Sequence, residues 1–97
     1  MKIIYEIEAS VELQEAVAWY LLHAGVRQAE ALVRDLNARL SLVTQFPMSG
    51  TPGVRDTRSM PLRVFPYTVH YRVEADVIRI FAVAHQKRRP GYWRKRR

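Results

Sequence analysis

The spacing of apolar residues changes twice along the chain and divides it into strand-like and helical stretches. Residues 2–8 are rich in Ile and Tyr and partly alternate with polar residues, which predicts a first β-strand. From residue 10 the apolar positions follow a helical period, and Ser10 is the kind of residue that caps a helix start. We therefore expect a helix over about residues 10–24, with one face formed by Leu13, Ala16, Val17, Tyr20, Leu21 and Ala24.

A second helix is predicted over about residues 26–45, after Gly25 stops the first. Its apolar face consists of Ala29, Leu32, Val33, Leu36, Leu40 and Val43. Asp35 and Arg39 have the spacing of an exposed intrahelical ion pair. The short connection predicts a helix hairpin. Trp19 and Leu22 lie off the apolar face of the first helix, and we expect them to pack against the second. The alternative is a docking patch for another chain.

Turn-forming residues at 46–53 end the helical half, and the period then becomes that of strands. Strands are predicted over about residues 55–64, 67–73 and 77–85, with Pro61 favouring an edge or a bulge in the first of them. Residues 67–73 alternate cleanly, so that Thr68 and His70 should face away from the core. Residues 77–84 are apolar almost throughout, which predicts a central strand covered on at least one face.

These elements predict an α+β fold with the order β-α-α-β-β-β. Short turns make the last three strands an antiparallel meander, and the first strand must join the sheet to bury its apolar side. The helix hairpin should then pack on one face of the sheet. At 97 residues, the chain is expected to form a single domain over residues 1–97.

Composition narrows the chemistry that is open to this chain. The absence of cysteine excludes disulfides, thiol catalysis and thiolate metal sites. Three scattered histidines, His23, His70 and His85, do not suggest a metal site, and no cofactor is expected. No stretch approaches the roughly 20 apolar residues that span a bilayer, and no signal peptide is evident. We therefore expect a soluble cytoplasmic protein without a membrane partner.

The net charge of +7 is concentrated at the C-terminal end. Residues 1–84 contain nine basic and nine acidic side chains, so the surplus lies in the last thirteen residues. This basic tail, residues 86–97, also contains Tyr92 and Trp93. Two large aromatic side chains beside Pro90 and Gly91 should cover apolar surface on the sheet or on the helix hairpin. We expect residues 95–97 to be frayed in the free protein.

Three segments of the sequence have a familiar pattern: Gln45-Phe46-Pro47-Met48-Ser49-Gly50, Phe65-Pro66-Tyr67-Thr68-Val69-His70-Tyr71-Arg72-Val73, and the strand that runs into His85-Gln86-Lys87-Arg88-Arg89-Pro90-Gly91-Tyr92-Trp93. Together they resemble the RelE/ParE superfamily of type II toxin–antitoxin toxins. The resemblance implies a small growth-inhibiting toxin that is neutralised by a cognate antitoxin in a hetero-oligomer. Its target would be DNA gyrase in the ParE-like branch, or the ribosome and its mRNA in the RelE-like branch.

The resemblance favours the ParE-like branch, which acts by binding. Thr68 and Gln86 stand where RelE-like ribonucleases are described with basic residues, whereas Tyr92 fits their tyrosine position. The alternatives are a ribosome-dependent mRNA endoribonuclease and a degenerate member that only binds its antitoxin. For a ribonuclease, which needs groups that shuttle protons and neutralise the phosphate, the catalytic candidates are Tyr92, His85, Lys87 and Arg88.

For binding to a target or to an antitoxin, the candidates are basic and aromatic residues of the sheet and the tail. We name Arg55, Arg58, Arg63, His85, Lys87, Arg88, Arg89, Tyr92 and Trp93. An acidic antitoxin segment would lie along the helix hairpin or across the open face of the sheet.

Overall fold

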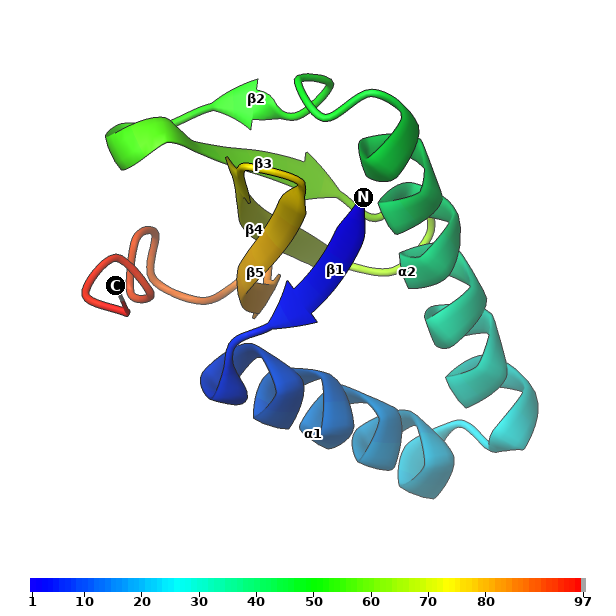
Figure 1. Ribbon diagram of the computed structural model, residues 1–97. Coiled ribbons are helices and arrows are strands. Elements are labelled where there is room, and N and C mark those ends of the chain that lie inside the picture. Colours follow the sequence, from blue (N-terminus) through cyan, green and yellow to red (C-terminus); the bar gives the residue numbers. More distant parts are fainter. Residues whose placement is uncertain (97) are drawn as a thin grey trace.

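A computed structural model describes residues 1–96 of the chain (Figure 1). Two helices, α1 (Ile7–His23) and α2 (Val26–Gln45), follow the first strand, β1 (Lys2–Tyr5). The remaining strands are β2 (Thr51–Pro52), β3 (Thr57–Pro61), β4 (Tyr67–Glu74) and β5 (Val77–His85). Neither helix is long and apolar enough to cross a membrane within this described part of the chain. The α+β class and the helix hairpin followed by strands are confirmed.

The five strands form one mixed sheet in the order β1-β5-β4-β3-β2. The pairs from β2 to β5 are antiparallel, as the short turns predict, whereas β1 runs parallel to β5. A parallel pair needs a long crossover connection, and the two helices are part of it here. Because β5 lies between β1 and β4, it is an interior strand, as its apolar sequence predicts.

The first helix begins at Ile7, three residues before the predicted start at Ser10. The ladder between β1 and β5 ends at Tyr5 and Ile80, and the Glu6 N–H then donates to the Ile80 carbonyl. Glu6 occupies the cap position without a side-chain cap bond, so the prediction that Ser10 caps the helix is wrong. Only four residues of β1 are paired with β5, and α1 begins directly after Glu6.

The predicted strand over residues 55–64 is shorter and is preceded by a hairpin that the sequence did not indicate. Arg55 and Asp56 have φ angles of 53° and 61°, which turn the chain in a 3-10 segment, Val54–Asp56. This turn folds β2 back onto β3, where it pairs only with Arg58 and Ser59. Pro61, at the far end of β3, is beyond the reach of β2, so the predicted edge position of this proline is confirmed.

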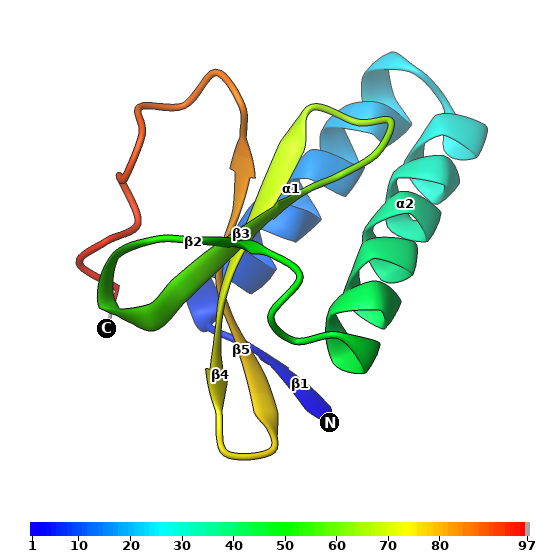
Figure 2. The ribbon, with the colours of Figure 1, turned by 90° about the horizontal axis from the view of Figure 1, so that it is seen from above.

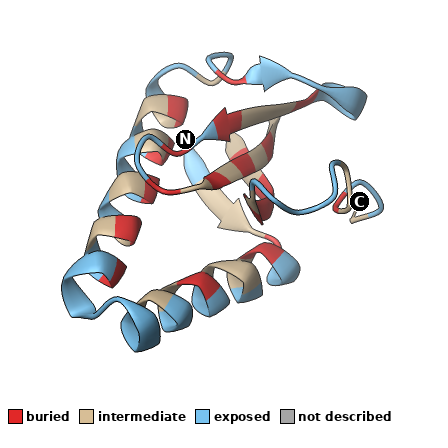
Figure 3. Cartoon of the chain, turned by 180° about the vertical axis from the view of Figure 1, so that it is seen from behind, coloured by how far each residue is buried: buried red, intermediate tan, exposed pale blue. Residues whose placement is uncertain are grey.

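One face of the sheet and the inner faces of the helices form the main core (Figure 3). The alternation along β4 is confirmed, since Tyr67, Val69 and Tyr71 are buried in this core. The predicted face of α2 is buried except for Val33, which is partly exposed. In α1 only Ala9 and Ala16 are fully buried, and Leu21 is 48% exposed.

A bulge in β5 gives this strand a second apolar face. His70 pairs with Ala82 and Tyr71 with Ile80, so Phe81 is the extra residue between them. Ile78, Ile80 and Val83 join the main core, whereas the second cluster consists of Phe81, Ala82, Ala84, Trp93 and, partly, Tyr92. The strand is therefore covered on both faces, which explains its nearly continuous apolar sequence.

Trp19 and Leu22 do not pack against α2, contrary to the prediction. Their exposed fractions are 53% and 80%, and the Trp19 ring contacts Tyr20 and His23 of its own helix. These side chains lie off the buried face of α1 and remain at the surface.

Asp35 is held by a loop and not by the expected pair with Arg39. Its carboxylate accepts the backbone N–H groups of residues 63, 64 and 65 at 2.8–3.0 Å. The Arg39 guanidinium donates to the Pro61 carbonyl at 2.9 Å. The two side chains thus fasten α2 to the end of β3 and to the β3–β4 connection.

Tyr71 connects the centre of the sheet to the loop after α2. Its hydroxyl donates to the Pro47 carbonyl at 2.8 Å and accepts the Gly50 N–H at 3.0 Å, and the residue is fully buried. A Cβ at position 50 would lie 2.5 Å from this hydroxyl, so the close approach requires glycine.

We predict that Tyr71→Phe lowers the free energy of unfolding by about 1–3 kcal/mol, because two buried polar groups lose their partner. Urea denaturation measures the change. Tyr5→Phe is the matched control, since the Tyr5 hydroxyl makes no hydrogen bond within residues 1–96. An effect no larger than that of the control would contradict this role of the hydroxyl.

Candidate functional site

The basic tail crosses the face of the sheet that lies opposite the helices (Figure 2). The Trp93 side chain is 8% exposed and stacks on His70, with ring centroids 4.4 Å apart and an interplanar angle of 27°. The prediction that Tyr92 and Trp93 cover apolar surface is confirmed. His70, expected to face solvent, lies instead beneath the indole of Trp93.

One carboxylate of α1, that of Glu12, fastens the tail. It accepts hydrogen bonds from the Tyr92 hydroxyl and from the Val83 backbone N–H. The Arg96 guanidinium donates to both of its oxygens, at 3.0 and 3.2 Å, and to the Phe81 carbonyl at 3.1 Å. Arg96 is therefore anchored, and the prediction that it is frayed is wrong. Lys95 is exposed. Arg97 lies outside the described residues.

The Tyr92 ring is enclosed by charged groups. The Arg88 guanidinium lies 3.9 Å above its centroid and that of Arg96 lies 5.1 Å away. Burial, together with the hydrogen bond to the Glu12 carboxylate and its charge, raises the pKa of the Tyr92 hydroxyl far above its ordinary value. This hydroxyl stays protonated and engaged at neutral pH.

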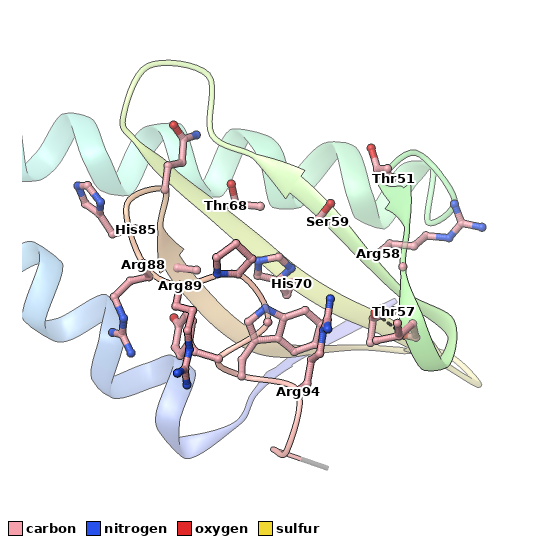
Figure 4. A pocket seen from close by; sticks show the side chains of 18 residues that line it. Thr51, Thr57, Arg58, Ser59, Thr68, His70, His85, Arg88, Arg89 and Arg94 are labelled. Atoms are coloured by element: carbon pink, nitrogen blue, oxygen red, sulfur yellow. Dashed lines mark hydrogen bonds between the residues drawn. The ribbon is translucent and has the colours of Figure 1, made fainter.

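A pocket of about 340 Å³ opens between the sheet and the tail (Figure 4). Side chains of β3 and β4 form one wall, and the tail forms the other. Its lining includes Thr51, Thr57, Arg58, Ser59, Thr68, His70, His85, Gln86, Arg88, Arg89, Pro90, Gly91, Tyr92, Trp93 and Arg94. Among residues 1–96, no acidic residue lines it. We call it the tail pocket.

The cations of the tail pocket differ in how they are held. Arg58 donates to the Met48 and Gly50 carbonyls at 3.0 and 2.9 Å, and its guanidinium points toward that loop (Figure 4). Arg88 stacks on Tyr92. The guanidinium groups of Arg89 and Arg94 make no hydrogen bond or ion pair within residues 1–96. Two positive charges are thus available to a ligand.

The two histidines of the tail pocket are already engaged. Burial lowers the pKa of His70 to about 4, with only partial opposition from the charge of Glu12, so this imidazole is neutral at pH 7. The Nδ1 atom of His85 accepts the Lys87 backbone N–H at 3.0 Å, and its ring contacts Tyr67 edge-on at 5.1 Å.

The structure brings together six of the residues that the sequence suggested and separates three. Arg58, His85, Arg88, Arg89, Tyr92 and Trp93 line the tail pocket. Arg55 is outside it, in the turn before β3, and donates to the Arg94 carbonyl at 3.5 Å. Arg63 lies in the β3–β4 connection, and Lys87 is not among the lining residues of the pocket.

Sequence reasoning missed the sheet hydroxyls and Glu12, and it considered Arg94 only as one of the basic residues of the tail. Thr51, Ser59 and His70 lie in one cross-strand row, which only the pairing of β2 with β3 and of β3 with β4 creates. The alternating sequence of β4 did indicate the face of the sheet on which Thr68 lies, which it shares with His70. Glu12 carried no such signal, because an acidic residue in the first turns of a helix already has a local explanation in the helix dipole.

No group of three or more His, Asp or Glu side chains is placed to hold a metal ion in the part of the chain that the structure describes.

The element order, the mixed sheet and a match to a toxin family over residues 3–90 together show a toxin of the RelE/ParE superfamily. Residues 3–90 match the model of the family described as ParE toxin of type II toxin-antitoxin system, parDE. The chain belongs to this ParE toxin family. No curated protein matches the sequence.

Solved structures resemble the fold at low sequence identity. One is a chain of the structure described as the chromosomal ParDE TA system from P. aeruginosa. It has a TM-score of 0.74 and 20% identity, and the match covers 88% of the present chain and 95% of that chain. At this identity the match shows a shared fold.

Proposed function

We propose that this ParE-family toxin inhibits growth by binding DNA gyrase and holding it in its DNA-cleavage complex. Family membership supports the target, and the state of Tyr92 supports a mechanism of binding without catalysis. A ribonuclease would need Tyr92, His85, Lys87 and Arg88 around one phosphate with a free proton-transfer group. In the structure the Tyr92 hydroxyl is bound by Glu12, and the Lys87 side chain is outside the tail pocket.

The test compares two purified targets. We expect the toxin to inhibit supercoiling by gyrase and to accumulate cleaved plasmid, and to leave mRNA intact on translating ribosomes. Cleavage of mRNA with no effect on gyrase would overturn the proposal in favour of the RelE-like alternative. Inactivity in both assays, with antitoxin binding retained, would identify a degenerate member.

We further propose that a cognate antitoxin lies along the helix hairpin. The tail covers part of the other sheet face, which leaves that face less open than the sequence suggested. Between the helices a groove of about 400 Å³ is lined by Val17, Leu21, Val26, Ala29, Glu30, Val33 and Arg34. Leu21 and Val26 are 48% and 61% exposed there, and an amphipathic segment could bury them.

Co-expression with the adjacent reading frame tests this second proposal. Leu21→Asp should weaken the toxin–antitoxin complex at least about tenfold, since a carboxylate would be buried among apolar side chains. Leu22→Asp is the control, because Leu22 is more exposed and lies outside the groove. Equal affinity of the two variants would place the antitoxin elsewhere, and no complex at all would remove the antitoxin from the proposal.

A further inference from the structure

Several polar groups of the tail pocket make no hydrogen bond or ion pair within residues 1–96. Three arginines outside its lining are paired with carboxylates: Arg72 and Arg79 with Glu74, and Arg96 with Glu12, at 2.7–3.0 Å. In the tail pocket Arg89 and Arg94 have no carboxylate within reach among residues 1–96. Unbalanced charge in a concave site attracts an anion.

Neutral donors lie on the opposite wall. Thr51, Ser59 and Thr68 line the pocket, and their hydroxyls make no hydrogen bond to any described residue. Thr51 pairs with Ser59, and Ser59 with His70, so these side chains share one face of the sheet beside Thr68. Each hydroxyl can donate one hydrogen bond.

The hollow exists because small side chains occupy this part of the sheet. Thr68 pairs with Ala84, and Ser59 lies on the neighbouring strand. The tail is held above them by Trp93 on His70 and cannot fill the space. Gly91, with a φ of 75°, lets Arg94 fold back over the tail, since a Cβ there would lie 2.6 Å from its Nε.

We propose that the tail pocket binds the phosphate group of a nucleotide, with Arg94 and Arg89 supplying the charge and Ser59 and Thr68 the neutral donors. A phosphate offers three or more acceptor oxygens, which suits donors that converge from two walls better than a single carboxylate does. The volume of about 340 Å³ is in the range of small-ligand sites. The site goes beyond the proposed action on gyrase and does not depend on it. A free nucleotide and a nucleic-acid strand carry the same group.

The binding test uses the full-length toxin with Trp19→Phe, so that Trp93 is the remaining tryptophan and reports on the pocket. The probes are inorganic phosphate, adenosine 5′-monophosphate, a thymidine octanucleotide and a glutamate-rich peptide. We expect saturable fluorescence changes with the phosphate-bearing probes. Tighter, salt-dependent binding of the octanucleotide would identify a strand as the source, and equal binding would identify a free nucleotide.

Variants separate the pocket from the general positive charge. Arg94→Ala should weaken nucleotide binding about tenfold or more, because a charge-assisted hydrogen bond is lost. Arg34→Ala removes the same charge from exposed α2 and should change binding less than about twofold. Ser59→Ala leaves the tail contacts intact and should weaken binding about threefold to tenfold.

Three outcomes would overturn the proposal. They are the absence of saturable binding at millimolar phosphate or nucleotide, equal losses in Arg94→Ala and Arg34→Ala, and preferential binding of the acidic peptide. Because gyrase is absent from the assay, these outcomes are independent of the test of the toxin's target.

Discussion

Glu12→Gln should release the tail from the sheet while the body of the toxin stays folded. The substitution removes the charge that binds Arg96 and weakens the acceptor of the Tyr92 hydroxyl. Both side chains of the ion pair are mostly shielded from water, with exposed fractions of 11% for Glu12 and 19% for Arg96. We expect the docked tail to lose about 2–3 kcal/mol of stability.

Hydrogen exchange measures this effect locally. The N–H groups of Tyr92, Arg94 and Arg96 donate to carbonyls within the tail, and their exchange should become roughly 30- to 100-fold faster. Trp93 fluorescence should shift to longer wavelength as the ring leaves His70. Glu15→Gln is the control, because Glu15 is exposed and makes no hydrogen bond or ion pair within residues 1–96.

Unchanged exchange in Glu12→Gln would show that Trp93 alone holds the tail. The double variant Glu12→Gln with Arg96→Gln separates the contributions further. If the two residues act through their mutual contact, the combined effect should be smaller than the sum of the single effects.

Asp35→Ala should lower the global free energy of unfolding by about 1.5–3 kcal/mol, because three backbone N–H groups lose a charged acceptor. Two of these hydrogen bonds are exposed, so water compensates part of the loss. Urea denaturation measures the change. Asp35→Asn should be intermediate, and Glu30→Ala, on the exposed side of the same helix, should stay within about 0.5 kcal/mol of the parent.

The contribution of Asp35 should depend on pH in a defined direction. Partial burial raises the pKa of its carboxyl, but the N–H groups of Phe65, Val64 and Arg63 and the charge of Arg39 outweigh this and leave the pKa below its ordinary value. A lowered folded-state pKa stabilises the protein above the unfolded value of about 3.9. The difference between the parent and Asp35→Asn should therefore be constant near neutrality and shrink as the pH falls through that value toward the folded-state pKa.

A stability difference that persisted unchanged in acid would show that the Asp35 charge is irrelevant. An effect of Asp35→Ala equal to that of Glu30→Ala would contradict the anchoring of the β3–β4 connection by this carboxylate.

The sequence by itself determined which side of each main element is buried. A side chain's direction repeats every two residues in a strand and every 3.6 in a helix, so the buried apolar residues recur in the sequence with the same period. Tyr67, Val69 and Tyr71 therefore reached the core as predicted, and so did Leu32 and Leu36 of α2. The anchoring of Tyr92 and Trp93 was also predictable, because large aromatic side chains usually pack against apolar surface.

The sequence could not indicate the partners of polar side chains, because these come from distant parts of the chain. Asp35 was expected to pair with Arg39 four residues away, yet it binds a loop 28 to 30 residues further on. Glu12 has the ordinary position of an acid near a helix start, but its partners Tyr92 and Arg96 are 80 and 84 residues away. Local spacing contains no information about such contacts.

The tail pocket is likewise a product of the tertiary structure. The basic residues of the tail were evident in the sequence, and Thr68 was placed on the correct face of its strand. The tail lies over this face because the bulge at Phe81 gives β5 a second apolar face and because Glu12 binds Tyr92 and Arg96. Only then do Arg89 and Arg94 stand opposite Ser59 and Thr68, because packing between the sheet, α1 and the tail sets their distance. The sequence determined the burial pattern and the charge, and the tertiary structure decided where that charge meets the sheet.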